Sequence, residues 1–122
     1  MAEKPYMKFW VGDYLTKTHH LSVQEHGAYV RLLMEAWATP TCSLPDDPAW
    51  IKRRLHVTDD EFDEFVKPII DEFWTKEVHR IFQKRQRKEF ENAIYRSEMA
   101  KSAANKRHHG RKVIPLKTKE DE

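Results

Sequence analysis

The residues best suited to chemistry in this chain are seven histidines, one cysteine and two pairs of neighbouring carboxylates. The histidines form no recognised zinc spacing, and no second cysteine or His-Glu-x-x-His pattern accompanies them. Ser22 is better explained as a helix cap than as a nucleophile, and Cys42 lies in an expected loop between two prolines. Asp46-Asp47 and Asp59-Asp60 stand where helices should begin, and their charge there complements the helix dipole. We therefore expect no enzyme activity, no cofactor and no metal site.

Composition limits the chain to one modest core. It has 122 residues, of which 39% are hydrophobic and 34% are charged. A single cysteine excludes an intramolecular disulfide and suits a reducing compartment. No apolar run is long enough to span a bilayer, and residues 1–8 lack the apolar stretch of a secretory signal. We expect a cytoplasmic protein with no membrane partner.

Charge is distributed unevenly along the chain. Residues 1–77 hold 9 lysines and arginines against 14 aspartates and glutamates, whereas residues 78–122 hold 13 against 6. A basic segment of this kind predicts contact with a polyanion, here DNA of undetermined strandedness, although a merely solubilising face is the alternative. The candidate nucleic-acid contacts are Lys52, Arg53, Arg54, Arg80, Lys84, Arg85, Arg87, Lys88, Arg96, Lys101, Lys106 and Arg107.

Capping signals predict three helices in the first part of the chain. Ser22 and Glu25 form a capping box before a helix over 23–38, and Asp47-Pro48 begins a short helix over 48–55. Thr58 and Glu61 form a second box before a helix over 59–73, which Pro68 should kink or break near residues 64–67.

A hairpin and a long helix are expected to follow. Residues 73–82 predict a short β-hairpin, and residues 83–106 predict a charged helix whose first half packs on the body. Gly110 and Pro115 should end regular structure, with a disordered tail from Arg111.

Apolar spacing predicts which side chains form the core. Trp37 is expected on the buried face of helix 23–38, opposite Phe62, Val66 and Phe73. Ala49, Ile51 and Leu55 are expected to point inward from helix 48–55. Gly27 costs roughly 1 kcal/mol against alanine inside a helix, which suggests that another element approaches it closely.

Three helices followed by a hairpin is the winged helix-turn-helix order. We therefore predict a mostly α fold with a small β-hairpin: a winged-helix-like domain over 1–96, followed by a basic helix extension and tail over 97–122. The helix in the recognition position, 59–73, carries seven acidic residues against Lys67 alone. Phosphates would repel it, so DNA contacts should come from residues 52–54, the hairpin and the last helix.

A resemblance supplies a biological setting. The residues that carry it are Asp13-Tyr14-Leu15, His20-Leu21-Ser22, Gly27-Ala28-Tyr29, Leu32-Leu33, Trp37 and Leu44-Pro45-Asp46-Asp47. In this order and spacing they resemble the YdaU-like family of domains of unknown function, found in prophages and at the N-terminus of phage replication-initiation proteins. The resemblance covers roughly residues 4–96. The family's wing turn usually contains glycine, where this chain has Thr75-Lys76-Glu77.

What the resemblance implies is a non-enzymatic, phage- or prophage-derived accessory or initiator-type protein of DNA replication. Family members often continue into a second replication domain, which this chain is expected to lack. Two alternatives remain open. One is a protein–protein module for homo-oligomerisation or for recruiting a helicase or another replication protein. The other is a winged-helix transcriptional regulator, which the acidic helix disfavours.

Overall fold

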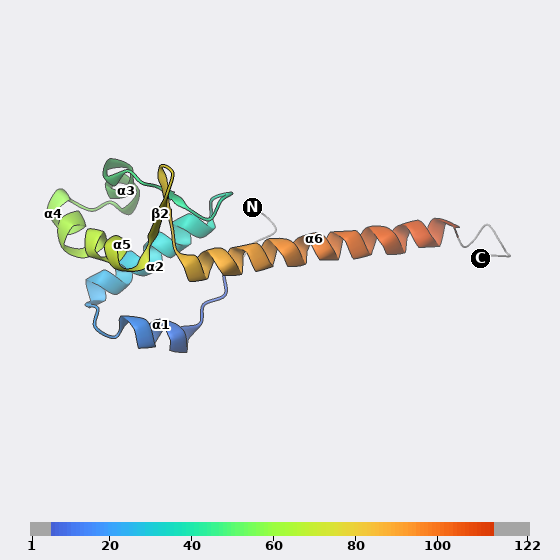
Figure 1. The fold of residues 1–122 in the computed structure, drawn as a ribbon, viewed down its shortest axis with the longest axis horizontal. Helices are drawn as coiled ribbons and strands as arrows, with labels where there is room; N and C mark the ends of the chain where they lie inside the picture. The colour runs from blue at the N-terminus through green and yellow to red at the C-terminus, as the bar shows by residue number, and fades with distance from the viewer. Residues whose placement is uncertain (1–5, 114–122) are drawn as a thin grey trace. The chain divides into compact units, whose positions relative to one another are not determined.

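The computed structural model describes residues 6–113, with side chains described over 6–106. The elements follow one another as α1 (Val11–Thr18), α2 (Val23–Trp37), β1 (Leu44–Pro45), α3 (Pro48–Leu55), α4 (Asp59–Glu61), the π-helix η1 (Phe62–Val66), α5 (Lys67–Phe73), β2 (Thr75–Glu77), β3 (Arg80–Phe82) and α6 (Lys84–Val113) (Figure 1). The chain is mostly helical with one small sheet and a long last helix. Two compact units meet in sequence between Phe90 and Glu91, inside α6. The expected boundary after residue 96 also falls within this helix.

The starts of α2, α3 and α4 are as predicted. At α2, Ser22 Oγ accepts from the Glu25 N–H at 3.1 Å, while Glu25 Oε1 accepts from the Ser22 N–H at 2.8 Å. Thr58 and Glu61 make the same reciprocal pair at 3.1 and 2.8 Å before α4. Asp47 accepts from the Ala49 N–H at 3.1 Å, with Pro48 in the first turn of α3. Each box satisfies donors that a helix start leaves without partners.

The predicted disturbance near Pro68 is a π-turn. Proline has no N–H to donate to the carbonyl four residues back. The helix therefore widens over η1, where the Lys67 N–H reaches the Phe62 carbonyl five residues earlier, and resumes as α5. The π-turn therefore rotates the side chains of α5 relative to those of α4, while the backbone stays helical from Asp59 to Phe73.

A three-stranded antiparallel sheet lies between the helical segments. The predicted hairpin is present as β2 and β3, with Lys76 paired to Ile81. Its turn was placed wrongly: Thr75-Lys76-Glu77 form β2, and the chain turns at Val78 and His79, where φ of His79 is 60°. The sequence did not indicate β1, which pairs Leu44 with Ile81 and gives the strand order β1-β3-β2. Two residues are too few to show the alternation that marks a strand.

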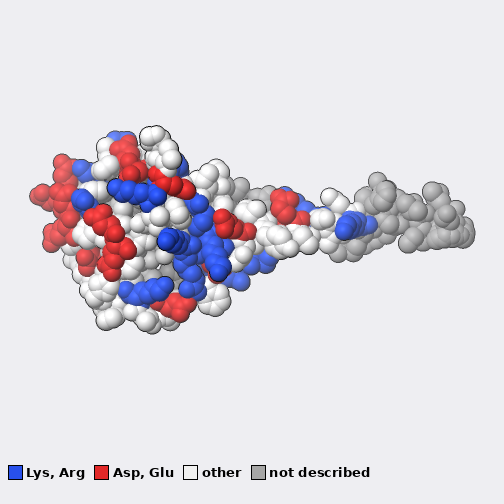
Figure 2. All heavy atoms as spheres, viewed as in Figure 1, with Lys and Arg blue, Asp and Glu red and all other residues white. Residues whose placement is uncertain are grey.

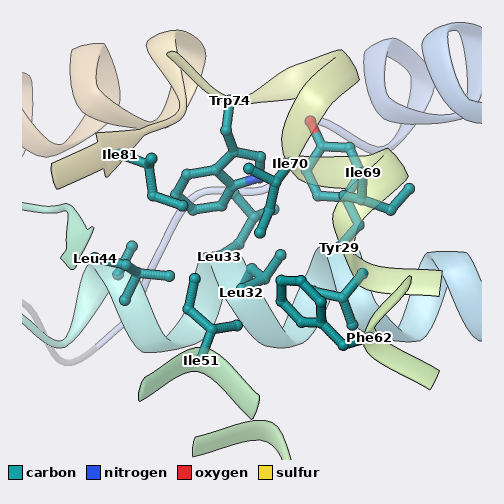
Figure 3. Close-up of a cluster of buried hydrophobic side chains, with 12 residues drawn as sticks. Tyr29, Leu32, Leu33, Leu44, Ile51, Phe62, Ile69, Ile70, Trp74 and Ile81 are labelled. Carbon is teal, nitrogen blue, oxygen red and sulfur yellow. The ribbon is translucent and has the colours of Figure 1, made fainter. Parts of the chain in front are cut away.

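The core forms around the inner face of α2 (Figure 3). Tyr29, Leu32 and Leu33 from α2 meet side chains from α3, η1, α5 and two strands. The other buried members are Ala36, Leu44, Ile51, Phe62, Val66, Ile69, Ile70, Trp74 and Ile81. This one cluster joins every element from α2 to β3 except α4 and β2, whose described residues are not buried.

Trp37 is buried as expected, but its predicted partners are wrong. Its side chain is 8% exposed, and its ring meets that of Phe90 edge-on at 5.7 Å between centroids. The last turn of α2 lies against the start of α6, where Gln86 Nε2 donates to the Leu33 carbonyl at 2.6 Å. The apolar stripe of α2 therefore packs partly against the core and partly against the start of α6. The spacing of the apolar residues does not show which of them contacts which neighbour.

Four further expectations are corrected. Helix α1 was not predicted, because Gly12 and its β-branched residues disfavour a helix locally. A Cβ added at Gly27 would meet nothing within 4 Å, so no element approaches it closely. Ala49 is exposed, and Trp50 packs against the core in its place. Gly110 does not end α6, which continues to Val113. The rest of the expected tail, 114–122, lies outside the described residues.

Candidate nucleic-acid interface

The body separates its charges by sign. All seven carboxylate residues between Asp59 and Phe73 are exposed. Figure 2 shows acidic side chains gathered over α4 and the helices that follow it, and basic side chains in a band over the hairpin and the start of α6. The field of this face therefore favours a polyanion at the start of α6 and disfavours one at α5.

Two of the predicted lysines at the start of α6 are available for a ligand. Lys84 and Lys88 lie one turn apart, are exposed, and have no ion pair among the described residues. Their neighbours are engaged. Arg87 lies 2.9 Å from Glu77 and 4.2 Å from the Phe82 ring centroid. Arg85 pairs with Asp13 at 2.9 Å.

Of the three basic residues of α3, two are ion-paired and one is not, among the described residues. Lys52 pairs with Asp59 at 3.1 Å, and Arg54 pairs with Glu35 at 3.1 Å while lying 5.1 Å from the Trp50 ring. Arg53 is exposed and has no ion pair in the part of the chain that the structure describes. Together with its neighbours it lines an open hollow of about 380 Å³, whose walls are Arg31, Glu35, Trp50, Arg53, Arg54 and His56.

The structure gives Arg80 a role inside the sheet. Its Nε donates to Ser43 Oγ at 2.6 Å, and its Nη2 donates to the Ser43 carbonyl at 2.9 Å. Ser43 is fully buried beside β1. Arg80 therefore ties β1 to β3, and it is half-buried where an exposed wing residue was expected.

The remaining candidates lie in the second unit. Arg96, Lys101 and Lys106 are exposed on α6. Arg107 belongs to the same helix, but its side chain lies outside the described residues. Beyond Glu91 every described side chain of α6 is exposed or half-buried, so no core constrains this stretch.

Sequence reasoning missed a small cavity between the N-terminal segment, α2 and the first turns of α6. Its volume is about 70 Å³, and its wall includes Trp10, Tyr14, Tyr29, Gln83, Gln86 and the exposed lysines Lys8 and Lys17. Burial raises the pKa of Tyr29 to about 12, helped by the nearby Tyr14. In Lys8-Phe9-Trp10 a basic residue precedes two aromatic residues, and this is the sequence signal that could have indicated the site.

Three further observations concern metal ligands, the cysteine and the membrane. Between residues 6 and 106, no three His, Cys, Asp or Glu side chains gather where they could hold a metal ion. The Cys42 thiol is fully buried. No described helix is both long enough and apolar enough to cross a membrane.

These features define a small helical domain with a three-stranded sheet and a segregated basic face. The chain belongs to the family described as "Protein of unknown function (DUF1376)", whose pattern matches residues 5–91. It is also similar to "Uncharacterized protein YdaU" of Escherichia coli (strain K12), with 51% identity over 39 residues. That match covers 32% of this chain and 14% of the relative. No solved structure matches the chain.

Proposed function

We propose that this chain is a non-enzymatic nucleic-acid-binding protein of winged-helix topology that assists or initiates phage- or prophage-derived DNA replication. The observation that carries the proposal is the pair of lysines at the start of α6 that are exposed and have no ion pair among the described residues, within the basic band beside the acidic helices (Figure 2). The replication setting rests on the resemblance to a family found in prophages and replication-initiation proteins.

The order of elements supports the winged-helix assignment. A helix (α2), a short strand, two helical segments and a hairpin follow one another, and the first strand pairs with the last to give β1-β3-β2. In this arrangement the hairpin is the wing, and its turn residue Val78 is 82% exposed. The segment from α4 to α5 occupies the recognition position.

Charge decides which surface contacts DNA. The exposed carboxylates from Asp59 to Glu72 would repel phosphates, and the π-turn already changes the phase of that segment. We place the contacts of the body on Lys84, Lys88 and Arg53. Arg96 and Lys106 are separate candidates in the second unit. Arg80 and Lys52 are held by protein partners and contribute less.

A salt titration with matched variants tests this surface. Lys88→Ala should lower the slope of log affinity against log salt by about 0.9 on duplex DNA, or about 0.7 on single strands, for one lost phosphate contact. Lys84→Ala combined with Lys88→Ala should double that change. Lys67→Ala is the control, because it removes the same charge from a residue paired with Asp71 on the acidic face. Equal slopes for the Lys67 and Lys88 variants would exclude the proposed surface.

A protein–protein module is the second candidate, and one feature favours it. An open apolar groove of about 520 Å³ runs beside α2, and Met34 in its wall is 51% exposed. The apolar part of the wall is completed by Val30, Leu55, Val57, Phe65 and Val66. If self-association through this groove is the function, Met34→Lys should dissociate the assembly in sedimentation experiments and leave DNA affinity unchanged.

A further inference from the structure

Two polar side chains, Gln86 and Tyr29, lie in the wall of the small cavity at the N-terminal segment. Gln86 is 5% exposed, and its Oε1 has no hydrogen-bond partner, although its Nε2 donates to the Leu33 carbonyl. Tyr29 Oη accepts from Gln83 Nε2 at 3.3 Å, and no described group accepts its proton.

Aromatic side chains form the opposite part of the wall. Trp10 is 49% exposed and Phe9 is 40% exposed, and the Phe9 ring lies 4.9 Å from that of Tyr14. Trp10 is held in place, because its Nε1 donates to Glu89 Oε2 at 2.9 Å and Arg85 lies 5.7 Å from its ring. A fixed and half-exposed indole is a surface on which a flat ring can stack at little entropic cost.

The volume of the cavity and the charge of its wall indicate what kind of ligand fits. A space of about 70 Å³ holds roughly five water-sized groups, which suits one planar ring and not a peptide. The two carboxylates in the wall already have partners, Asp13 with Arg85 and Glu89 with Trp10. The wall holds three cations, Lys8, Lys17 and Arg85, against the two carboxylates, so its net charge is positive.

We infer that this cavity takes one unstacked nucleobase of a single-stranded nucleic acid, with the flanking phosphates on Lys8 and Lys17. A base presents hydrogen-bond acceptors on its edge, which match the proton of the Tyr29 hydroxyl. A base inside a duplex could not enter. The inference rests on the proposed function, which it narrows to a preference for single strands.

The test compares the binding of the full chain to a short oligo(dT) and to an abasic deoxyribose-phosphate strand of equal length. Trp10→Ala should weaken oligo(dT) binding about 5- to 150-fold, the loss that corresponds to one base–aromatic stack. The salt slope should stay unchanged, since no phosphate contact is removed. Binding of the abasic strand should not change. Trp10→Phe should restore most of the affinity, and Tyr29→Phe, which keeps the ring, should also weaken oligo(dT) alone.

Tyr95→Ala is the matched control, because Tyr95 is an exposed aromatic residue of α6 outside this cavity. Equal losses for Trp10→Ala and Tyr95→Ala would overturn the cavity assignment. So would equal affinities of the unmodified chain for oligo(dT) and the abasic strand. In both cases a lowered salt slope for Lys88→Ala would leave the proposed function intact. Failure of both single strands to bind would overturn this inference, and failure of duplex DNA to bind as well would reject the proposed function.

Discussion

Arg80 and Lys84 are four residues apart and both belong to the basic segment, yet the structure assigns them different roles. We expect Arg80→Met to destabilise the body and Lys84→Met to leave its stability unchanged. Arg80 makes two hydrogen bonds to Ser43, at 2.6 and 2.9 Å. A hydrogen bond to a charged group contributes about 1.5–3 kcal/mol, so the two bonds set an upper limit of about 3–6 kcal/mol.

The remaining partners of Ser43 reduce that limit. Ser43 Oγ stays within 2.6 Å of Thr41 Oγ1, and the Ser43 carbonyl still accepts from Thr39 Oγ1 at 3.1 Å. Neither oxygen loses its last partner, and the half-buried guanidinium is partly hydrated already. We therefore expect a loss of about 2 kcal/mol, which corresponds to a fall in melting temperature of about 8–16 °C for a unit of this size.

Urea denaturation followed by far-ultraviolet circular dichroism measures both variants. Lys84 is exposed and unpaired in the first turn of α6, where a positive charge opposes the helix dipole, so its removal should be neutral or slightly stabilising. A loss below about 0.5 kcal/mol for Arg80→Met would refute the structural role of Arg80. An equal loss for Lys84→Met would show that positive charge in general, and not the contact with Ser43, stabilises the sheet.

Three other predictions concern pH, packing and charge. Because the pKa of Tyr29 is about 12 in the folded state against 10.0 as the ordinary value, the unfolded chain loses this proton first. The free energy of unfolding should therefore fall by about 1.4 kcal/mol per pH unit between these values, and Tyr29→Phe should remove that slope in urea titrations. Trp37→Ala empties a buried site against Phe90 and should cost about 3–5 kcal/mol in the same assay, whereas a loss under about 1 kcal/mol would contradict its burial. Asp60→Lys combined with Asp63→Lys should strengthen DNA binding or leave it unchanged in a fluorescence-anisotropy titration, and a large loss with the fold intact would place the acidic face in the interface.

Much of the local structure could be predicted because its causes are local. The capping boxes of Ser22 with Glu25 and Thr58 with Glu61 close between residues three apart, so the sequence shows both partners at once. Pro68 disturbs its own helix for a reason that no distant contact changes. The acidic character of 59–73 and the basic character of the last segment are likewise properties of composition.

The candidate sites depended on contacts that the sequence does not display. Strand β1 forms because Leu44 pairs with Ile81 of β3. Arg80 is half-buried because its guanidinium donates to Ser43, 37 residues away in the sequence. The N-terminal cavity is lined by residues of α1, α2 and α6. One of them, Gln86, is buried because α6 packs against α2 at Leu33. Sequence by itself determined where helices begin and which segments carry charge, since bonds and charges between near neighbours are independent of the rest of the fold. Only the tertiary structure decided which lysines and arginines are left without an ion pair and which side chains line one cavity. Both depend on residues that are far apart in the sequence and that the fold brings together.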